Sequence, residues 1–464
     1  MKITHFNNSF LEILIRNFKI VCDPWFYPAN HGGWQATPSL SKHVYKHALS
    51  TADIIYISHL HSDHLDERLL HEFRNNIHAE FLVPAYKNRH LAKRIKNILP
   101  HNVCHELEPL KSFEPITSVE LYIYPQMSSS QTINPAEDKT FSYDLDSSLL
   151  TIDRISGSTF FNQVDNPLSV DDFRNLKIFL RDLSVKRLDC LCMAVGAASQ
   201  YPQCFLDQDL VSAKEKVLKR FLADFSSKLS IINPKVFFPA GGDYSIGLPY
   251  CHLEKYMAVP SFNVLDCTVK SASSALALDL RGGKSLDLQS LEVTSNHEFN
   301  ANIINESNND HRKFVDLCIN KETLMTEEQF SCYSLAELFV KAKNNYFSRF
   351  LSIADLQNSM IFPDFAFILY ENSPVTVEIL DSIIHISAQS NPTDRFELEF
   401  AGDLANEACQ RISIEYHMTS LDFRKLLCRI FNWNQYTAGS NCLLRRAPDV
   451  HIPWHEMSLN FLVV

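Results

Sequence analysis

The sequence predicts a layered α/β domain followed by a smaller α+β unit. Across the first 285 residues, short apolar and β-branched runs alternate with amphipathic helical segments, which is typical of stacked sheets and helices. A stretch rich in Ser, Asn and charge then runs from about residue 285 to 310 and reads as an exposed connector. The expected units are a main domain over 1–285, a connector over 286–330 and a C-terminal α+β unit over 331–464.

The main domain should contain a buried strand that ends at a cluster of polar residues. Asp53–Ser58 is β-branched and stops abruptly. Helices are expected over 65–74 and 86–99, with a strand at Phe81–Val83 between them, and a long amphipathic helix over 208–228. Further strands are expected at Leu11–Ile15, Lys19–Val21, Val119–Tyr124, Ser148–Ile152, Ser158–Phe161, Cys190–Val195 and Val236–Phe238.

The C-terminal unit should mix helices with short strands. A helix is expected over 334–348, and a second one over 421–431 with Ser420 as its N-cap. Lys425, Arg445 and Arg446 either offer cations to a phosphate or lie on a solvated face. The strands are expected at Val375–Ile379, Ile384–Ser387 and Phe396–Phe400.

The composition argues against a nucleic-acid-binding protein and against a membrane protein. The net charge of −11 argues against a nucleic-acid partner, since binding to phosphate backbones depends on clustered cations. No uninterrupted apolar run reaches the length of about 18 residues that a membrane helix needs, and the N-terminus lacks the pattern of a signal peptide. The 12 cysteines are scattered, as expected of free thiols in a reducing cytoplasm.

Glycine is scarce, and its placement is informative. Six of the 11 glycines fall in three pairs. A chain so sparing with glycine is expected to place pairs where the backbone turns sharply or approaches another segment closely. The pairs are Gly32-Gly33, Gly241-Gly242 and Gly282-Gly283.

The polar cluster after the buried strand predicts a metal site. His59, His61, Asp63 and His64 follow the strand within six residues. His59 and His61 are two apart, so at the end of a strand they project to one side and can share an ion. Asp63 and His64 fall in the turn into the next helix, within reach of a second ion about 3.5–4 Å from the first. Imidazole and carboxylate ligands suit zinc, iron or manganese.

This H-x-H-x-D-H spacing is the signature of the metallo-β-lactamase superfamily, and further segments resemble a narrower branch. That branch is the CMP-N-acetylneuraminate hydroxylase family with its bacterial relatives. The resemblance spans nearly the whole chain and implies a metallo-β-lactamase αββα sandwich with a smaller C-terminal domain. The segments that carry it are Ile20–Phe26 with Gly33-Trp34, Asp144–Ser148, Phe161–Asn166, Gly196–Pro202, Pro239–Gly242, Cys251–Tyr256 and Trp433 to Asp449.

The resemblance also implies a set of ligands. One ion would take His59 and His61, and the other Asp63, His64 and His252, with Asp165 bridging. The histidine that the superfamily usually supplies after the strand ending at Tyr124-Pro125 is missing, because Gln126-Met127-Ser128 follows instead. Its substitute could be Asp146, Asp144 or Gln126. Asp63 and Asp165 are the residues expected to take part in catalysis, and Asp23 is expected to brace a ligand histidine rather than to bind metal.

Two chemistries fit such a binuclear site. A carboxylate in place of the third histidine favours iron, and the resemblance then implies an oxygenase or hydroxylase acting on a sugar or nucleotide-linked small molecule. The vertebrate hydroxylase carries a Rieske domain, whose paired Cys and His motifs are not found here, so electrons would come from an external electron-transfer protein. The alternative is a zinc- or manganese-dependent hydrolase of the lactonase or phosphodiesterase type, in which a metal-activated water attacks the substrate.

Overall fold

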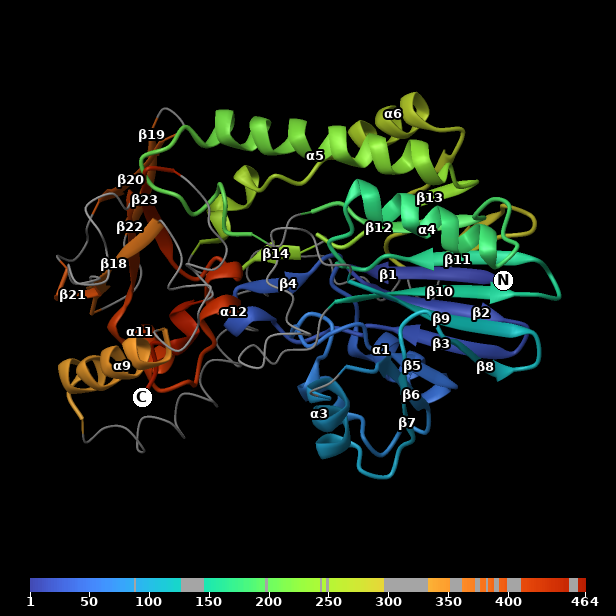
Figure 1. Ribbon diagram of the computed structural model, residues 1–464, viewed down its shortest axis with the longest axis horizontal. Coiled ribbons are helices and arrows are strands. Elements are labelled where there is room, and N and C mark those ends of the chain that lie inside the picture. The colour runs from blue at the N-terminus through green and yellow to red at the C-terminus, as the bar shows by residue number, and fades with distance from the viewer. Residues whose placement is uncertain are drawn as a thin grey trace.

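The computed structural model shows two β-sheets packed face to face, with helices on the outer side of each, and a further unit at one end (Figure 1). The residues it describes are 1–86, 89–126, 146–196, 199–242, 244–247, 250–295, 333–350, 361–371, 376–380, 383–387, 392–398, 410–449 and 458–464.

The first sheet has eight strands in the order β17-β16-β1-β2-β3-β5-β6-β7. Neighbouring strands are antiparallel from β17 to β3 and parallel from β3 to β7. The carboxyl ends of β3, β5 and β6 therefore meet at one edge of the sheet. The strands are β1 (Lys2–Asn7), β2 (Phe10–Ile15), β3 (Phe18–Cys22), β5 (Ile54–Tyr56), β6 (Glu80–Pro84), β7 (Cys104–Leu107), β16 (Lys284–Asp287) and β17 (Val293–Ser295).

The second sheet has seven strands in the order β15-β13-β12-β11-β10-β9-β8. Strands β8 to β11 are antiparallel, while β11, β12, β13 and β15 run parallel. The strands are β8 (Ser112–Ile116), β9 (Val119–Pro125), β10 (Ser147–Asp153), β11 (Ser158–Asn162), β12 (Cys190–Ala194), β13 (Val236–Ala240) and β15 (Leu276–Ala277).

Alternating side chains build three apolar layers around these sheets. Cys190 and Cys192 of β12 face the core between the sheets, whereas Leu191 and Met193 face the helices, as the two-residue period of a strand requires. Helices α1 (Lys42–Thr51), α2 (Glu67–Glu72) and α3 (His90–Ile98) cover the first sheet. Helices α4 (Val170–Asp182), α5 (Leu210–Ile232) and α6 (Phe262–Ala272) cover the second. The predicted αββα sandwich is confirmed.

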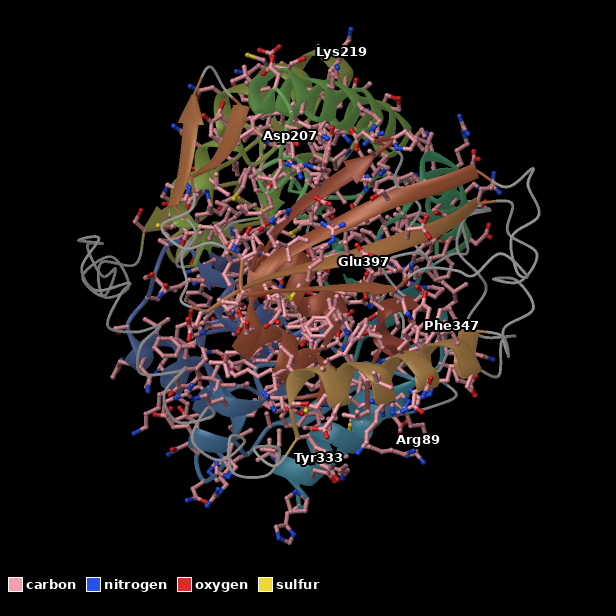
Figure 2. The ribbon with its side chains drawn as sticks, turned by 90° about the vertical axis from the view of Figure 1, so that its left-hand side faces the viewer. Arg89, Asp207, Lys219, Tyr333, Phe347 and Glu397 are labelled. Atoms are coloured by element: carbon pink, nitrogen blue, oxygen red, sulfur yellow. The ribbon has the colours of Figure 1, made fainter. Side chains whose placement is uncertain are left out.

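The C-terminal unit is built on a four-stranded sheet with the order β21-β18-β22-β23. In Figure 2, α9 runs below this sheet, between the labelled Tyr333 and Phe347, with Glu397 on β21 above it. The elements are α9 (Leu335–Phe350), β18 (Ile361–Tyr370), β21 (Asp394–Leu398), β22 (Gln410–Thr419), α11 (Ser420–Leu427), α12 (Trp433–Ala438), β23 (Leu443–Ala447) and η3 (Leu459–Phe461), with β19 (Thr376–Leu380) and β20 (Ile383–Ser387) forming a separate hairpin.

The two units share one apolar core. Trp25 and Trp34 of the main domain are buried in the same cluster as Trp433. Backbone hydrogen bonds also connect the two units: Leu206 N donates to Leu444 O at 2.7 Å, and Leu444 N donates to Cys204 O at 2.9 Å. Three short elements complete it: η1 (Asn30–Gly32), and β4 (Trp34–Ala36) paired with β14 (Tyr244–Ile246).

A glycine pair lies at this join, as the scarcity of glycine predicted. A Cβ at Gly33 would collide with the carbonyl of Gly439 on the C-terminal side. The 3-10 turn at 30–32 can therefore touch the end of α12 only because neither Gly33 nor Gly439 has a side chain. The C-terminal unit docks on the main domain through backbone as well as through apolar side chains.

Several expectations about the elements need correction. The first sheet continues through β17 to Ser295, so the end of the main domain, expected at residue 285, falls inside β16. Strand β17 is exposed and has no run of apolar residues that would predict it. Residues 296–332 lie outside the described part of the chain. Helices α1, α4 and α6 were not expected, and the helix after β22 is capped by Thr419, whose Oγ1 accepts from Asp422 N at 3.0 Å, not by Ser420. No helix among the described residues is long and apolar enough to cross a membrane.

Candidate metal centre

The H-x-H-x-D-H loop is held between a buried strand and a capped helix. Strand β5 is buried along its whole length and the loop leaves it at Ser58. His64 N and Leu65 N both donate to His61 O, at 3.0 and 2.8 Å, which closes a tight turn. Asp66 then caps α2 by accepting from Leu69 N at 2.9 Å. The loop is therefore short and fixed at both ends, as a preformed site requires.

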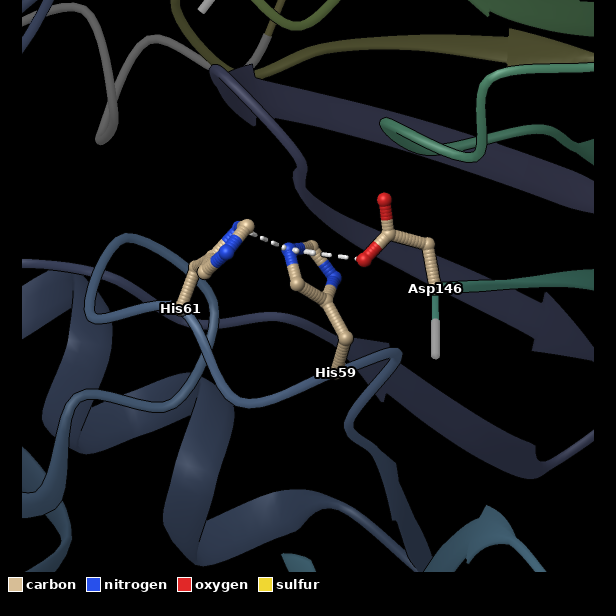
Figure 3. Close-up of side chains that lie close together, drawn as sticks. All are labelled: His59, His61 and Asp146. Carbon is tan, nitrogen blue, oxygen red and sulfur yellow. Dashed lines mark hydrogen bonds and ion pairs between the residues drawn. The ribbon is translucent and has the colours of Figure 1, made fainter. Parts of the chain in front are cut away.

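His59, His61 and Asp146 form the first group of candidate ligands (Figure 3). His59 Nε2 lies 2.8 Å from His61 Nδ1 and 3.7 Å from Asp146 Oδ1. His59 is buried, Asp146 is partly buried and His61 is exposed, so the group opens to solvent at His61. Asp146 was one of three residues considered for the missing third ligand, and the structure places it beside these two histidines.

Contacts across the two sheets bring Asp146 to this position. Ser147, at the start of β10, donates from its Oγ to Ser58 O at 2.8 Å. The same Oγ lies 2.8 Å from Tyr56 OH on β5. Gln126 accepts through its Oε1 from Asp146 N at 3.2 Å and donates its own N–H to Asp146 O at 3.1 Å. The side chain of Gln126 thus supports the backbone of Asp146, while Asp144 lies outside the described residues.

His64, Asp165 and Asp63 converge on a second position. His64 Nε2 lies 3.1 Å from Asp165 Oδ2 and 3.3 Å from Asp63 Oδ2. His59 also lies within ligand distance of His64 and Asp165. However, His59 Nδ1 is 2.9 Å from Ser58 Oγ, so only Nε2 is available and a single lone pair serves one ion. His59 therefore fits the first group, with Asp63 completing the second.

Asp23 braces both groups from behind, as the sequence predicted. Its buried carboxylate lies 3.0 Å from His64 Nδ1 and accepts from Ser58 N at 2.8 Å and Ser58 Oγ at 2.7 Å. Ser58 Oγ in turn contacts His59 Nδ1. One carboxylate thus orients His64 directly and His59 through Ser58, which leaves both Nε2 atoms pointing at the site. Metal-binding histidines are commonly supported in this way.

Gly241 leaves room for Asp165. Its φ is +77°, and a Cβ there would lie 2.9 Å from Asp165 Oδ1 and 3.1 Å from Ala194 Cβ. Gly241 N also donates to Asn8 O at 3.2 Å. The second predicted glycine pair therefore lies where the backbone after β13 passes close to a candidate ligand.

The charges of the site shift several pKa values. Burial, His64 and His61 hold the pKa of His59 well below its ordinary value. Burial would lower the pKa of His64, but Asp63, Asp165 and Asp23 raise it well above its ordinary value. Burial raises the pKa of Asp146 to about 6, opposed by His61 and aided by Asp165. The protein alone thus holds a proton on His64, which an ion would have to displace to bind.

His252 is not brought into either group. It lies on the 3-10 segment η2 (Cys251–Tyr256) and is exposed, and neither group of ligands found among the described residues includes it. Its assignment as a ligand of the second ion stays a prediction. The roles of Ser58 and Ser147 were missed, because serines that support a site carry no local sequence signal that sets them apart.

The donors fit a pair of divalent ions. Three imidazoles and three carboxylates converge. The donor atoms of His59, His61 and Asp146 lie within 4.8 Å of one another, as do those of His59, His64 and Asp165, and Asp63 Oδ2 lies 3.3 Å from His64 Nε2. The bracing by Asp23 leaves Nε2 of two histidines unprotonated on metal binding. Such mixed nitrogen and oxygen sets bind zinc, iron or manganese. The αββα sandwich with this loop at the end of β5 is a metallo-β-lactamase fold.

Comparison with curated proteins finds relatives that match over a short stretch of the chain. No family model matches the sequence. A protein of Mycolicibacterium smegmatis named for a Rieske 2Fe-2S iron–sulfur protein is 32% identical over 111 residues, which cover 24% of this chain and 21% of the relative. A Mycobacterium tuberculosis protein with the same kind of name is 33% identical over 92 residues, 19% of this chain and 18% of the relative. The chain spans about a fifth of the length of these relatives.

Comparison with solved structures finds proteins of similar fold at low identity. A mutant of the CmlA β-hydroxylase is 13% identical with a TM-score of 0.39, over 61% of this chain and 53% of that one. An isothiocyanate hydrolase from Delia radicum gut bacteria is 14% identical with a TM-score of 0.40, over 62% and 98%. A metallo-β-lactamase fold protein of Bacillus subtilis is 11% identical with a TM-score of 0.37, over 61% and 97%. These likenesses do not extend to substrate or chemistry.

Proposed function

We propose that this protein is a binuclear iron enzyme that hydroxylates a small molecule. The observation that carries the proposal is the position of Asp146, 3.7 Å from His59 Nε2. A carboxylate joins two histidines there, so the first group would have an anionic donor in place of a third histidine. Anionic oxygen donors stabilise the higher oxidation states of iron better than neutral imidazoles do. The carboxylates of the site therefore favour iron and redox chemistry over zinc.

The residues would divide between two ions. His59, His61 and Asp146 would hold one, and Asp63 and His64 the other with His252, while Asp165 would bridge. Two irons held there would supply the activation of dioxygen. The chain's own contribution is orientation: Asp23 keeps a proton on His64 Nδ1 and Ser58 engages His59 Nδ1, so that the Nε2 atoms stay available. Asp63 and Asp165 complete the charge that the ions require.

The overall reaction needs an electron donor. Converting a C–H bond to C–OH with dioxygen consumes two electrons and two protons and releases one water. The described residues contain no cluster of cysteines that could hold an iron–sulfur centre, and a separate electron-transfer protein would supply the electrons. The relatives named for Rieske proteins, which match this chain over about a fifth of their own length, support this arrangement. The resemblance in sequence suggests a sugar or nucleotide-linked substrate.

Metal replacement and one variant test the proposal. Iron-loaded protein should consume dioxygen with a reductant, and Asp146→His should abolish oxygen consumption and shift the bound metal from iron toward zinc. Asp171→His, which changes an exposed carboxylate on α4, should leave both unchanged. Elemental analysis and an oxygen electrode give the readouts. Substrate turnover by zinc-only protein under strict anaerobiosis would refute the oxygenase and favour the hydrolase.

A further inference from the structure

A cavity lies next to the metal loop, between the main domain and the C-terminal unit. Its volume is about 290 Å³, close to the lower end of the range of small-molecule sites. Leu60 and Ser62 line it from the loop, and Lys425 and Phe431 line it from the C-terminal unit. None of the candidate metal ligands is part of its wall. The residues that alternate with His59 and His61 thus face a different space.

Lys425 brings a buried charge to this cavity. Its side chain is 93% buried, with 7% exposed, and its Nζ lies 4.8 Å from the centre of the Phe431 ring. Within the part of the chain that the structure describes, no ion pair or hydrogen bond engages this Nζ. Asp422, one turn earlier on α11, is close enough to interact electrostatically, but its Oδ2 accepts from Tyr436 OH at 3.0 Å. A buried ammonium without an ion pair or a hydrogen bond is costly.

The acidic residues in the cavity wall are already engaged. The carboxylate of Asp66 accepts from three backbone N–H groups, at 2.8 to 2.9 Å. Glu67 forms a two-point ion pair with Arg94, at 2.6 and 2.8 Å. Arg68 lies over the Tyr27 ring at 4.1 Å. The wall therefore carries a net positive charge, concentrated at Lys425.

His31 offers a neutral donor beside Lys425. Its Nε2 accepts from Asn432 N at 3.0 Å, so in the neutral ring the proton is on Nδ1. Burial and Lys425 lower the pKa of His31 to about 4, which keeps the ring neutral. The ring stacks on Phe431, with centroids 4.3 Å apart. No hydrogen bond to Nδ1 is found among the described residues.

We propose that this cavity binds a small molecule through a phosphate group. A phosphate offers several acceptor oxygens to the Lys425 ammonium and the His31 Nδ1–H, and charge-assisted hydrogen bonds of this kind are strong. Tyr27, Leu60 and Phe431 would pack against the rest of the ligand. The site is independent of the metal ions and of the reaction proposed above. From the sequence, Lys425, Arg445 and Arg446 could either offer cations to a phosphate or lie on a solvated face, and of the three only Lys425 is among the residues that line this cavity.

Calorimetric titration of the metal-loaded protein with inorganic phosphate, at constant ionic strength, tests this site. Wild type should bind phosphate saturably in the millimolar range or tighter. Lys425→Met should weaken binding by about 10- to 100-fold, the worth of one charge-assisted hydrogen bond, whereas Lys425→Arg should retain binding. Lys341→Met, which removes an exposed lysine that contacts the Tyr333 ring, is the matched control and should bind as wild type does.

Two further measurements keep the result unambiguous. Lys425→Met should keep or raise the Tm in the absence of phosphate, because it removes a buried charge without a partner. His61→Ala should bind phosphate as wild type does, since His61 is not part of the cavity. The proposal is overturned if wild type does not bind saturably, if Lys425→Met binds normally, or if His61→Ala abolishes binding, which would place the phosphate on the metal ions.

Discussion

The two faces of the loop from His59 to His64 differ in chemistry although they share one backbone. His59 and His61 meet a carboxylate from the second sheet. Leu60 and Ser62 face the cavity at the C-terminal unit, and Ser62 Oγ accepts from Asn30 N at 2.8 Å. The first face gathers ligand atoms, whereas the second anchors the loop to its support.

This difference indicates separate roles for the two sets of alternate residues in the loop. Asn30 is also bound from the other side, because Asn441 Nδ2 of the C-terminal unit donates to Asn30 O at 2.7 Å. The metal-facing residues are thus linked to the C-terminal unit through two hydrogen bonds. Substitutions on the first face should therefore change metal binding, and those on the second should change stability.

The largest effect is expected from removing a ligand on the metal face. His61→Ala should reduce bound metal from about two ions per chain to about one, because His59 and Asp146 alone do not complete a chelate. Elemental analysis of folded, metal-replete protein measures this. His71→Ala, which changes a histidine on the outside of α2, serves as the control. Retention of two ions by His61→Ala would contradict the assignment of the first group.

The contrast between the faces also explains what the sequence could and could not predict. The four ligand types at 59–64 are local, so strand period and spacing were enough to find them. Asp146 comes from the other sheet, and contacts of Ser147 with Tyr56 on β5 and with Ser58, which the sequence does not reveal, bring it to the loop.

The contacts of the second face could not be predicted from the sequence for the same reason. Asn30, Gly33 and Gly439 touch through backbone atoms, and a backbone contact leaves no side-chain pattern beyond the glycines themselves. The sequence left open whether Lys425 binds a phosphate or lies on a solvated face, because that choice depends on neighbours distant in the sequence. Helices α1 and α4 were missed because their polar faces blurred the apolar period.

A smaller effect is expected where backbone supports the metal face. Gly241→Ala should cost about 1–2 kcal/mol of stability, because a side chain at positive φ is strained, and should also weaken metal binding about tenfold by displacing Asp165. Gly157→Ala is the matched control, since Gly157 has φ +70° with nothing within 4 Å of its Cβ position. It should lose similar stability and keep its metal. Equal metal affinity in the two variants would show that Asp165 is not a ligand.

The smallest effect is expected from a substitution on the second face. It tests most directly whether the two faces of the loop have separate roles. Ser62→Ala leaves the buried N–H of Asn30 without its acceptor, which should cost about 1 kcal/mol of stability. Ser50→Ala removes a serine whose Oγ bonds only to His47 O of its own helix at 3.1 Å, and should cost less. Thermal unfolding and elemental analysis are measured on both proteins. Ser62→Ala should unfold at a lower Tm yet keep two ions, because Ser62 lies between two ligands in sequence but faces away from them. Loss of an ion from Ser62→Ala with an unchanged Tm would contradict this division. It would mean that the alternate residues of the loop do not have separate roles and that both faces contribute to metal binding.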